Sequence, residues 1–157
     1  MISIKKDFLV CGISIRTNNT LEMTEEGKIK KLLERFFTEN LLERIPNKVG
    51  ADLFSVYFNY ESDYTGDYDY LVGVKVKSEY NRDEFKTVQI QPGHYLKLKT
   101  QLGSLPQVVY DLWGKIWKMS KKELGGSRSY QTDYEIYGKE AQNPKHANVD
   151  IYLGIQK

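Results

Sequence analysis

The alternation of hydrophobic and polar positions predicts strands along most of the chain. Apolar residues at every second position are typical of strands with one buried face. Phe54, Val56 and Phe58 alternate with polar neighbours in this way, and Tyr134 and Ile136 do so around Glu135. Strands are expected over residues 8–19, 52–60, 68–77, 87–100, 130–137 and 148–156, with Pro92-Gly93 breaking the fourth.

Two segments instead show the three-to-four-residue spacing of an amphipathic helix. The first is expected to begin at Thr24 as its cap and to end at Pro46. In the second, Ser104, Pro106 and Gln107 form a predicted capping box and first turn. The apolar stripes are Ile29, Leu32, Leu33 and Phe36 in the first helix, and Val109, Leu112, Trp113, Ile116 and Trp117 in the second.

The order strand-helix-strand-strand therefore occurs twice, and glycines repeat with it. Gly12 and Gly93 are 81 residues apart, and Gly73 and Gly154 have the same spacing. We predict an internal duplication within a single domain over residues 1–157, with repeat 1 at about 8–78 and repeat 2 at about 86–156. The expected fold is α+β: tandem β-α-β-β units form one antiparallel-rich sheet layer, two main helices cover one face, and a ligand groove lies between the halves.

The alternation also sorts the strand residues by face, because successive side chains point to opposite sides. The face expected to meet the helices carries Phe54, Val56, Phe58, Tyr70, Val72, Val74, Leu96, Leu98, Tyr134, Ile136, Ile151, Leu153 and Ile155. The expected open face carries Tyr57, Asn59, Tyr95, Glu135, Tyr137 and Tyr152. The second set consists mainly of tyrosines around one carboxylate.

This composition suggests a binding surface for a flat, lipophilic cation. The chain has 12 Tyr, 6 Phe and 2 Trp, more rings than a core of this size needs. Tyrosine rings would make cation–π contacts, and Glu135 would neutralise the positive charge. A dimer interface, or the general preference of tyrosine for strands, explains the same pattern.

Charge and cysteine content narrow the class of protein. The net charge is +2 with both signs well mixed, which argues against a surface for nucleic acid. Cys11 is the single cysteine, so no internal disulfide is expected and a reduced compartment fits. No stretch reaches the ~20 apolar residues of a membrane span, and no signal-length apolar run opens the chain. A cytoplasmic protein without membrane contact is expected.

Sites for metals or cofactors are not expected. His94 and His146 do not stand at a metal-ligand spacing with Cys11. Asp63, Asp67 and Asp69 loosely resemble a calcium loop, but the later glutamate is missing at the required spacing. The sequence contains no phosphate-binding loop or dinucleotide fingerprint.

Four segments in order resemble the GyrI-like family, also called the bacterial transcription-activator effector-binding family, whose fold occurs in AraC-type regulators. They are Gly66-Asp67-Tyr68-Asp69-Tyr70-Leu71-Val72-Gly73, Ile90-Gln91-Pro92-Gly93-His94-Tyr95, Tyr130-Gln131-Thr132-Asp133-Tyr134-Glu135-Ile136-Tyr137 and Val149-Asp150-Ile151-Tyr152-Leu153-Gly154-Ile155. The resemblance implies two β-α-β-β repeats with a ligand groove between them. It implies that Glu135 neutralises hydrophobic cations there, with Tyr95, Trp113 and Tyr152 as groove rings.

Many members of that family follow a helix-turn-helix segment, whereas about seven residues precede the first predicted strand here. We therefore expect a stand-alone member, either a ligand sensor without its own DNA-binding segment or a drug-sequestering protein. A hydrolase with Glu135 as general base and Tyr95 or Tyr137 as hydrogen-bond donor is an alternative. A protein-interaction module is another, and both a monomer and a homodimer fit the sequence.

Overall fold

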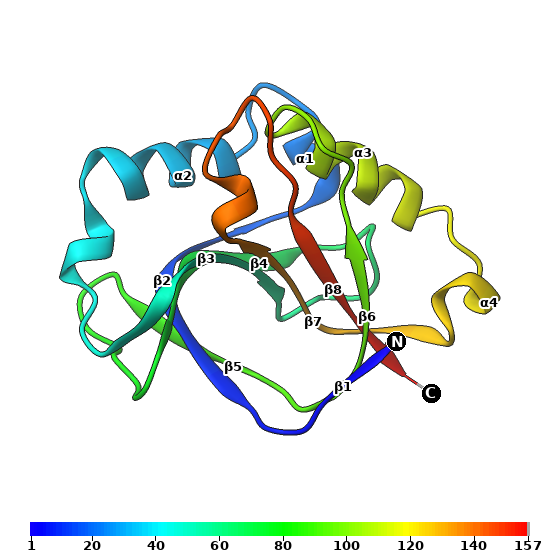
Figure 1. Ribbon diagram of the computed structural model, residues 1–157, viewed down its shortest axis with the longest axis horizontal. Coiled ribbons are helices and arrows are strands. Elements are labelled where there is room, and N and C mark those ends of the chain that lie inside the picture. The colour runs from blue at the N-terminus through cyan, green and yellow to red at the C-terminus, as the bar shows by residue number, and fades with distance from the viewer. Residues whose placement is uncertain (157) are drawn as a thin grey trace.

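The computed structural model describes residues 1–156 and contains a single eight-stranded antiparallel sheet (Figure 1). The strand order is β1-β6-β8-β7-β3-β4-β2-β5, and every neighbouring pair is antiparallel. The strands are β1 (Ile2–Ile4), β2 (Phe8–Thr17), β3 (Lys48–Phe58), β4 (Tyr68–Val76), β5 (Lys86–Ile90), β6 (Gly93–Lys99), β7 (Ser127–Tyr137) and β8 (Asp150–Gln156). The α+β class and the antiparallel sheet predicted from the sequence are confirmed.

Two longer helices cover one side of this sheet (Figure 1). Leu32 and Phe36 of α2, and Val109, Trp113 and Ile116 of α3, are buried there as their apolar spacing predicted. The helices are α1 (Asn19–Glu22), α2 (Ile29–Thr38), α3 (Gln107–Ile116) and α4 (Lys121–Leu124), with short 3-10 helices at Leu41–Arg44 and Lys139–Ala141. Along the described chain, residues 1–156, no helix has both the length and the apolar character needed to cross a membrane.

The sheet order reads alike from its middle outward. β7 and β3 pair at the centre, β8 and β4 follow, and β6 and β2 lie beyond them. β1, which precedes β2, pairs with β6, while β5, which precedes β6, pairs with β2. Each short strand thus joins the half that does not contain the strand after it. This arrangement agrees with the predicted duplication, which itself stays a prediction.

The sheet curls, so both of its faces are buried. One apolar cluster lies under α2 and another under α3. A third cluster fills the concave side away from the helices and contains Phe54, Val56, Leu71, Tyr95 and Tyr134. A sequence analysis that allowed only one covered face could not sort these residues correctly.

The predicted face assignment is accordingly wrong for β3 and β7. Tyr57 is opposite Tyr70 in the register, and Glu135 is opposite Ile151. Residues directly opposite each other share a face, so Tyr57, Glu135 and Tyr137 lie on the helix side. On the concave side lie Phe54, Val56, Phe58, Tyr134 and Ile136, which had been expected to meet the helices.

The helix starts also differ from the predicted ones. α2 begins at Ile29 rather than after Thr24, and the Glu22 carboxylate accepts hydrogen bonds from the backbone N–H groups of Lys28 and Ile29. α3 begins at Gln107 with Pro106 at its N-cap and no side-chain cap. The Gln107 side chain donates to Asp111 on the next turn instead of closing a capping box.

Candidate ligand-binding site

The site is centred on Glu135, whose side chain points from β7 toward α3. It is buried, with 1% of its surface exposed. Trp113 Nε1 donates to Oε2 at 2.6 Å, and Tyr57 Oη donates to the same oxygen at 2.9 Å. Tyr137 Oη donates to Oε1 at 2.7 Å. An ionised carboxylate can accept all three hydrogen bonds, whereas a protonated one would have to give up an acceptor site.

Burial and hydrogen bonding act in opposite directions on this acid. Loss of water raises the pKa of Glu135, and the donors Trp113, Tyr137 and Tyr57 lower it without cancelling the rise. Burial, reinforced by the nearby carboxylate, holds the pKa values of Tyr57 and Tyr137 well above the ordinary phenol value, so both stay donors. Within residues 1–156, no Lys or Arg forms a salt bridge with Glu135.

An aromatic pocket of about 490 Å³ adjoins the residues that hold this carboxylate. Its wall includes Tyr57 and Trp113, whose rings are 5.2 Å apart and stand between the cavity and Glu135. Residues of α1, β3, β4, α3 and β7 contribute to it, so the cavity lies between the two halves of the sheet. Its lining is Asn19, Glu22, Met23, Ile29, Tyr57, Tyr60, Tyr64, Tyr68, Tyr110, Trp113, Gly114, Trp117 and Arg128.

A buried ion pair forms the β7 side of the same pocket. Arg128 Nη2 lies 2.6 Å from Asp133 Oδ2, and the two side chains are 5% and 0% exposed. Tyr60 Oη donates to Asp133 Oδ2 at 2.5 Å, and the Gly154 N–H donates to Oδ1 at 2.8 Å. The Arg128 guanidinium lies 4.4 Å from the centre of the Tyr130 ring.

The structure brings together four of the six residues predicted for the site. Glu135, Tyr57, Trp113 and Tyr137 form one hydrogen-bonded cluster. The other two, Tyr95 and Tyr152, lie on the concave face. There both pack against Tyr134, with the Tyr134 and Tyr152 rings stacked at 4.6 Å. The alternation along each strand was predicted correctly, but the faces of β3 and β7 were exchanged relative to those of the other strands.

Most residues that line the aromatic pocket were not predicted from the sequence. Tyr60, Tyr64 and Tyr68 recur every fourth residue around a polar loop, and this spacing was the available signal. Arg128 gave another signal, because a carboxylate in mid-strand needs a positive partner and Arg128 is the arginine of that strand. The partner belongs to Asp133 rather than to Glu135.

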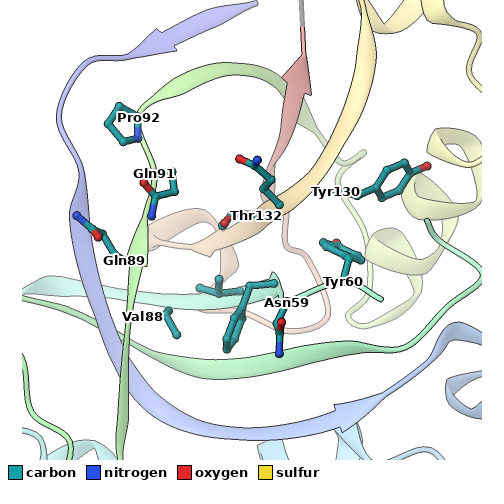
Figure 2. A pocket seen from close by; sticks show the side chains of 11 residues that line it. Asn59, Tyr60, Val88, Gln89, Gln91, Pro92, Tyr130 and Thr132 are labelled. Carbon is teal, nitrogen blue, oxygen red and sulfur yellow. The ribbon is translucent and has the colours of Figure 1, made fainter. Parts of the chain in front are cut away.

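A second pocket of about 730 Å³ opens on the concave face (Figure 2). Figure 2 shows Gln89 and Gln91 on one side of it and Tyr60 and Tyr130 on the other. Tyr60 also lines the aromatic pocket, so one side chain forms part of both walls. The Gln89 and Gln91 side chains that line the concave pocket are exposed. Within the described chain, its lining contains no buried carboxylate comparable to Glu135.

The other polar candidates have structural partners. His94 Nδ1 lies 3.2 Å from Ser3 Oγ, and Asp63 Oδ1 accepts a hydrogen bond from the Thr65 N–H. Asp69 pairs with Arg16. Among residues 1–156 there is no group of three His, Cys, Asp or Glu side chains placed to hold a metal ion.

Comparison with known proteins gives consistent relatives. YobU, a candidate transcriptional regulator of Bacillus subtilis (strain 168), is 29% identical over 150 residues, which cover 93% of this chain and 91% of YobU. The crystal structure of the Vibrio cholerae integron cassette protein VCH_CASS2 is 30% identical with a TM-score of 0.79, over 99% of this chain and 94% of that one. The structure of SAV2435 bound to tetraphenylphosphonium has a TM-score of 0.75 over 99% of this chain and 92% of that one. At 12% identity it shows a shared fold only.

A family profile also matches almost the whole chain. Residues 1–155 match the family described as Cass2, integron-associated effector binding protein. This match confirms the resemblance to effector-binding proteins that four sequence segments showed, and it supports a ligand-binding role. The chain therefore belongs to the Cass2 family of integron-associated effector binding proteins.

Proposed function

We propose that this protein binds hydrophobic organic cations in the aromatic pocket, with Glu135 as the negative anchor. The observation that carries this proposal is a buried carboxylate that, within residues 1–156, is held by the neutral donors Trp113, Tyr57 and Tyr137 and by no charged group. A cation in the pocket would provide the missing opposite charge, and low local polarity would strengthen the attraction.

The pocket wall suits such a ligand. A volume of about 490 Å³ falls within the range of small-molecule sites. Seven of the lining residues are Tyr or Trp, and each ring offers a π-face to a cation. Glu22 places a carboxylate in the lining itself. The fold shared with SAV2435, described as bound to the hydrophobic cation tetraphenylphosphonium, supports the same class of ligand.

Within this proposal the four clustered residues have distinct roles. Trp113 and Tyr57 form the pocket wall and hold Glu135 at the same time. Tyr137 holds the far oxygen and does not line the cavity. Tyr95 and Tyr152 are not part of this site, because they pack on the other face of the sheet.

Titration with tetraphenylphosphonium tests the proposal. Trp113 and Trp117 both line the pocket, so saturable quenching of tryptophan fluorescence is expected. Glu135→Gln should weaken binding by roughly 1–3 kcal/mol, the range for a hydrogen-bonded or paired charge. Glu34→Gln removes the same charge from an exposed position of α2 and should leave binding unchanged. Neutral triphenylmethanol should bind wild type and Glu135→Gln alike, and equal loss of both probes would refute the anchor role.

Proton linkage gives an independent check. A bound cation favours the ionised form of Glu135, whose pKa is raised by burial. Affinity for tetraphenylphosphonium should therefore increase as pH rises through the pKa of Glu135, and this increase should be absent in Glu135→Gln. Calorimetry in buffers of different ionisation enthalpy would measure the accompanying proton release.

The hydrolase alternative requires Glu135 to accept a proton from water. Both of its oxygens already accept hydrogen bonds, and the wall formed by Trp113 and Tyr57 separates it from the cavity. The geometry therefore favours an anchor over a general base. Turnover of a p-nitrophenyl ester, abolished in Glu135→Gln while phosphonium binding persists, would reverse this choice.

The family and YobU, named as a candidate transcriptional regulator, favour ligand sensing over sequestration. A sensing role predicts a change in a protein partner's DNA binding when the pocket is filled. If this chain binds such a partner but does not bind cationic ligands, the interaction-module alternative is favoured instead.

A further inference from the structure

The Arg128 guanidinium has unused hydrogen-bond donors in the wall of the aromatic pocket. Its side chain is 5% exposed and lines the cavity. Nη2 donates to Asp133, but Nε and Nη1 have no hydrogen-bond partner and are closed off from solvent. A buried charged donor without an acceptor costs more than an ordinary missing hydrogen bond, so these two positions are a specific deficit.

In the described chain, the groups around Arg128 do not accept hydrogen bonds from Nε or Nη1. The rings of Tyr130 and Trp113 lie 4.4 and 5.7 Å from the guanidinium carbon and present their π-faces to it. The Tyr130 hydroxyl is also near Arg128, but within residues 1–156 it is not within hydrogen-bond geometry of Nε or Nη1. Asp133 already accepts from Arg128, Tyr60 and the Gly154 N–H. Among residues 1–156, no acceptor therefore meets Nε or Nη1 of Arg128.

We propose that the ligand of the aromatic pocket carries an oxygen acceptor, such as a carbonyl, in addition to its positive charge, and that Arg128 Nε or Nη1 donates to this oxygen. This inference rests on the proposed function and narrows it from any hydrophobic cation to one bearing an acceptor. Asp133 offsets the charge of Arg128, so the guanidinium acts toward the ligand chiefly as a hydrogen-bond donor.

The geometry also limits where the acceptor lies on the ligand. Trp113 donates to Glu135 at 2.6 Å and has its ring 5.7 Å from the Arg128 guanidinium carbon, so one indole separates the anion from the free donors. The positive centre and the acceptor should therefore be about one aromatic ring apart. The Tyr60 and Tyr130 rings lie beside each other in the wall of the concave pocket (Figure 2), and the Tyr130 ring packs on the Arg128 guanidinium. Because Nε and Nη1 are closed off from solvent, donation to a ligand requires the Arg128 or Tyr130 side chain to rotate.

Two tetraarylphosphonium probes of equal shape test this inference. One carries a 4-acetyl group on a single ring, and the other carries a 4-isopropenyl group in which CH₂ replaces the oxygen. Wild-type protein should bind the acetyl probe roughly tenfold more tightly, as expected for one hydrogen bond to a charged group. Equal affinity for the two probes would overturn the inference and leave the proposed function standing. Failure of both to bind would refute the proposed function and the inference together.

Variants assign the difference to Arg128. Arg128→Met combined with Asp133→Asn removes the ion pair without leaving a lone buried charge, and it should reduce the ratio of the two affinities to about 1. Glu135→Gln should weaken both probes and keep the ratio. A ratio that persists in the double variant would overturn the assignment. Should that variant not fold, the Arg128 Nε–H resonance of the wild type decides: the acetyl probe should shift it and the isopropenyl probe should not, and equal shifts would contradict the inference.

Discussion

At the residue scale, the central feature is Glu135, a buried carboxylate that has no positively charged partner in the part of the chain that the structure describes. Its neighbours Trp113, Tyr57 and Tyr137 are neutral donors, so the charge is solvated by the protein but not cancelled. Asp133, two residues earlier on the same strand, is paired with Arg128. The two acids lie on the same strand, but only Asp133 has a charged partner within residues 1–156. This contrast is the reason for proposing Glu135, rather than Asp133, as the binding carboxylate.

Glu135 should make stability depend on pH. Because burial raises its pKa above the ordinary 4.5, the folded protein holds this proton more tightly than the unfolded chain. Its contribution to stability is therefore complete below the unfolded pKa and is lost as pH rises through the folded pKa. The free energy of unfolding of wild type minus that of Glu135→Gln should fall over this window, as measured by urea denaturation. A constant difference would mean that the pKa is not raised.

The Arg128–Asp133 pair should show strong coupling in a double-mutant cycle. Arg128→Met alone leaves Asp133 as a buried unpaired charge and should cost roughly 3–5 kcal/mol. Adding Asp133→Asn should recover part of that loss, since the remaining amide can still accept from Gly154. Denaturant unfolding of the four proteins measures the coupling, and additive losses would show that the pair is not a unit.

Identifying single residues from the sequence succeeded where chemistry alone decides and failed where geometry decides. Glu135 stood out because a mid-strand carboxylate among tyrosines is unusual, and it is the buried centre of the cluster. Tyr95 and Tyr152 are also strand tyrosines, but they pack on the opposite face of the sheet. Nothing in their local sequence distinguishes them from Tyr57, because the phase between strands depends on register and not on composition.

At the element scale, helix and strand identity followed from periodicity, but the starts of both main helices did not. The Glu22 carboxylate accepts hydrogen bonds from the N–H groups of Lys28 and Ile29 at the start of α2. Glu22 precedes these two residues by six and seven positions. The sequence rules consider side chains within about three residues of a helix start, so they favoured Thr24. A loop that folds back is invisible to such rules.

Glu22→Ala should therefore destabilise α2. It removes an acceptor for Lys28 N–H at 2.8 Å, Ile29 N–H at 3.1 Å and Thr17 Oγ1 at 2.5 Å. The loss of a helix cap predicts a cost of about 1–2 kcal/mol, measured by thermal unfolding. Glu25→Ala, at an exposed position nearby, is the control and should change little. Similar effects of both substitutions would show that the capping contacts do not stabilise the helix.

Two glycines should respond in opposite ways to alanine. Gly12 lies opposite Gly73, and a Cβ on Gly12 would come 1.8 Å from the carbonyl oxygen of Val72. Gly12→Ala should thus cost at least about 3 kcal/mol. Gly114 lies within α3, and among residues 1–156 an added Cβ would meet no atom within 4 Å beyond the adjacent residues and the helix's own backbone. Gly114→Ala should therefore gain roughly 0.5–1 kcal/mol. Melting temperatures measure both changes, and a stable Gly12→Ala protein would contradict the close strand approach.

At the scale of the whole molecule, the curled sheet gives the protein two interiors. The helix side holds the charged cluster and the aromatic pocket, and the concave side holds Phe54, Val56 and Tyr134 with their neighbours. The fold class and the order of the elements could be predicted from the sequence. The pairing of β1 and β5 with the opposite halves could not, because it consists of long-range contacts between short segments.

The edge strand β1 should contribute measurably to stability. Ile2 and Ile4 pack against the concave cluster, and β1 pairs with β6. Deleting residues 1–4 should cost roughly 2 kcal/mol from lost apolar burial. It should also expose the edge of β6, and exposed edges promote self-association. Urea denaturation and analytical ultracentrifugation measure the two effects, and a fully stable, monodisperse deletion protein would contradict this role for β1.

Tyr60 belongs to the lining of both cavities, and its hydroxyl is held by Asp133. Rotation of the Tyr60 side chain to admit a ligand to one pocket would therefore also change the shape of the other pocket. The surface around the concave pocket, on the far side of the sheet from the helices, would then differ between the ligand-free and the ligand-bound protein. A macromolecule bound to that surface would respond to the ligand without contacting it.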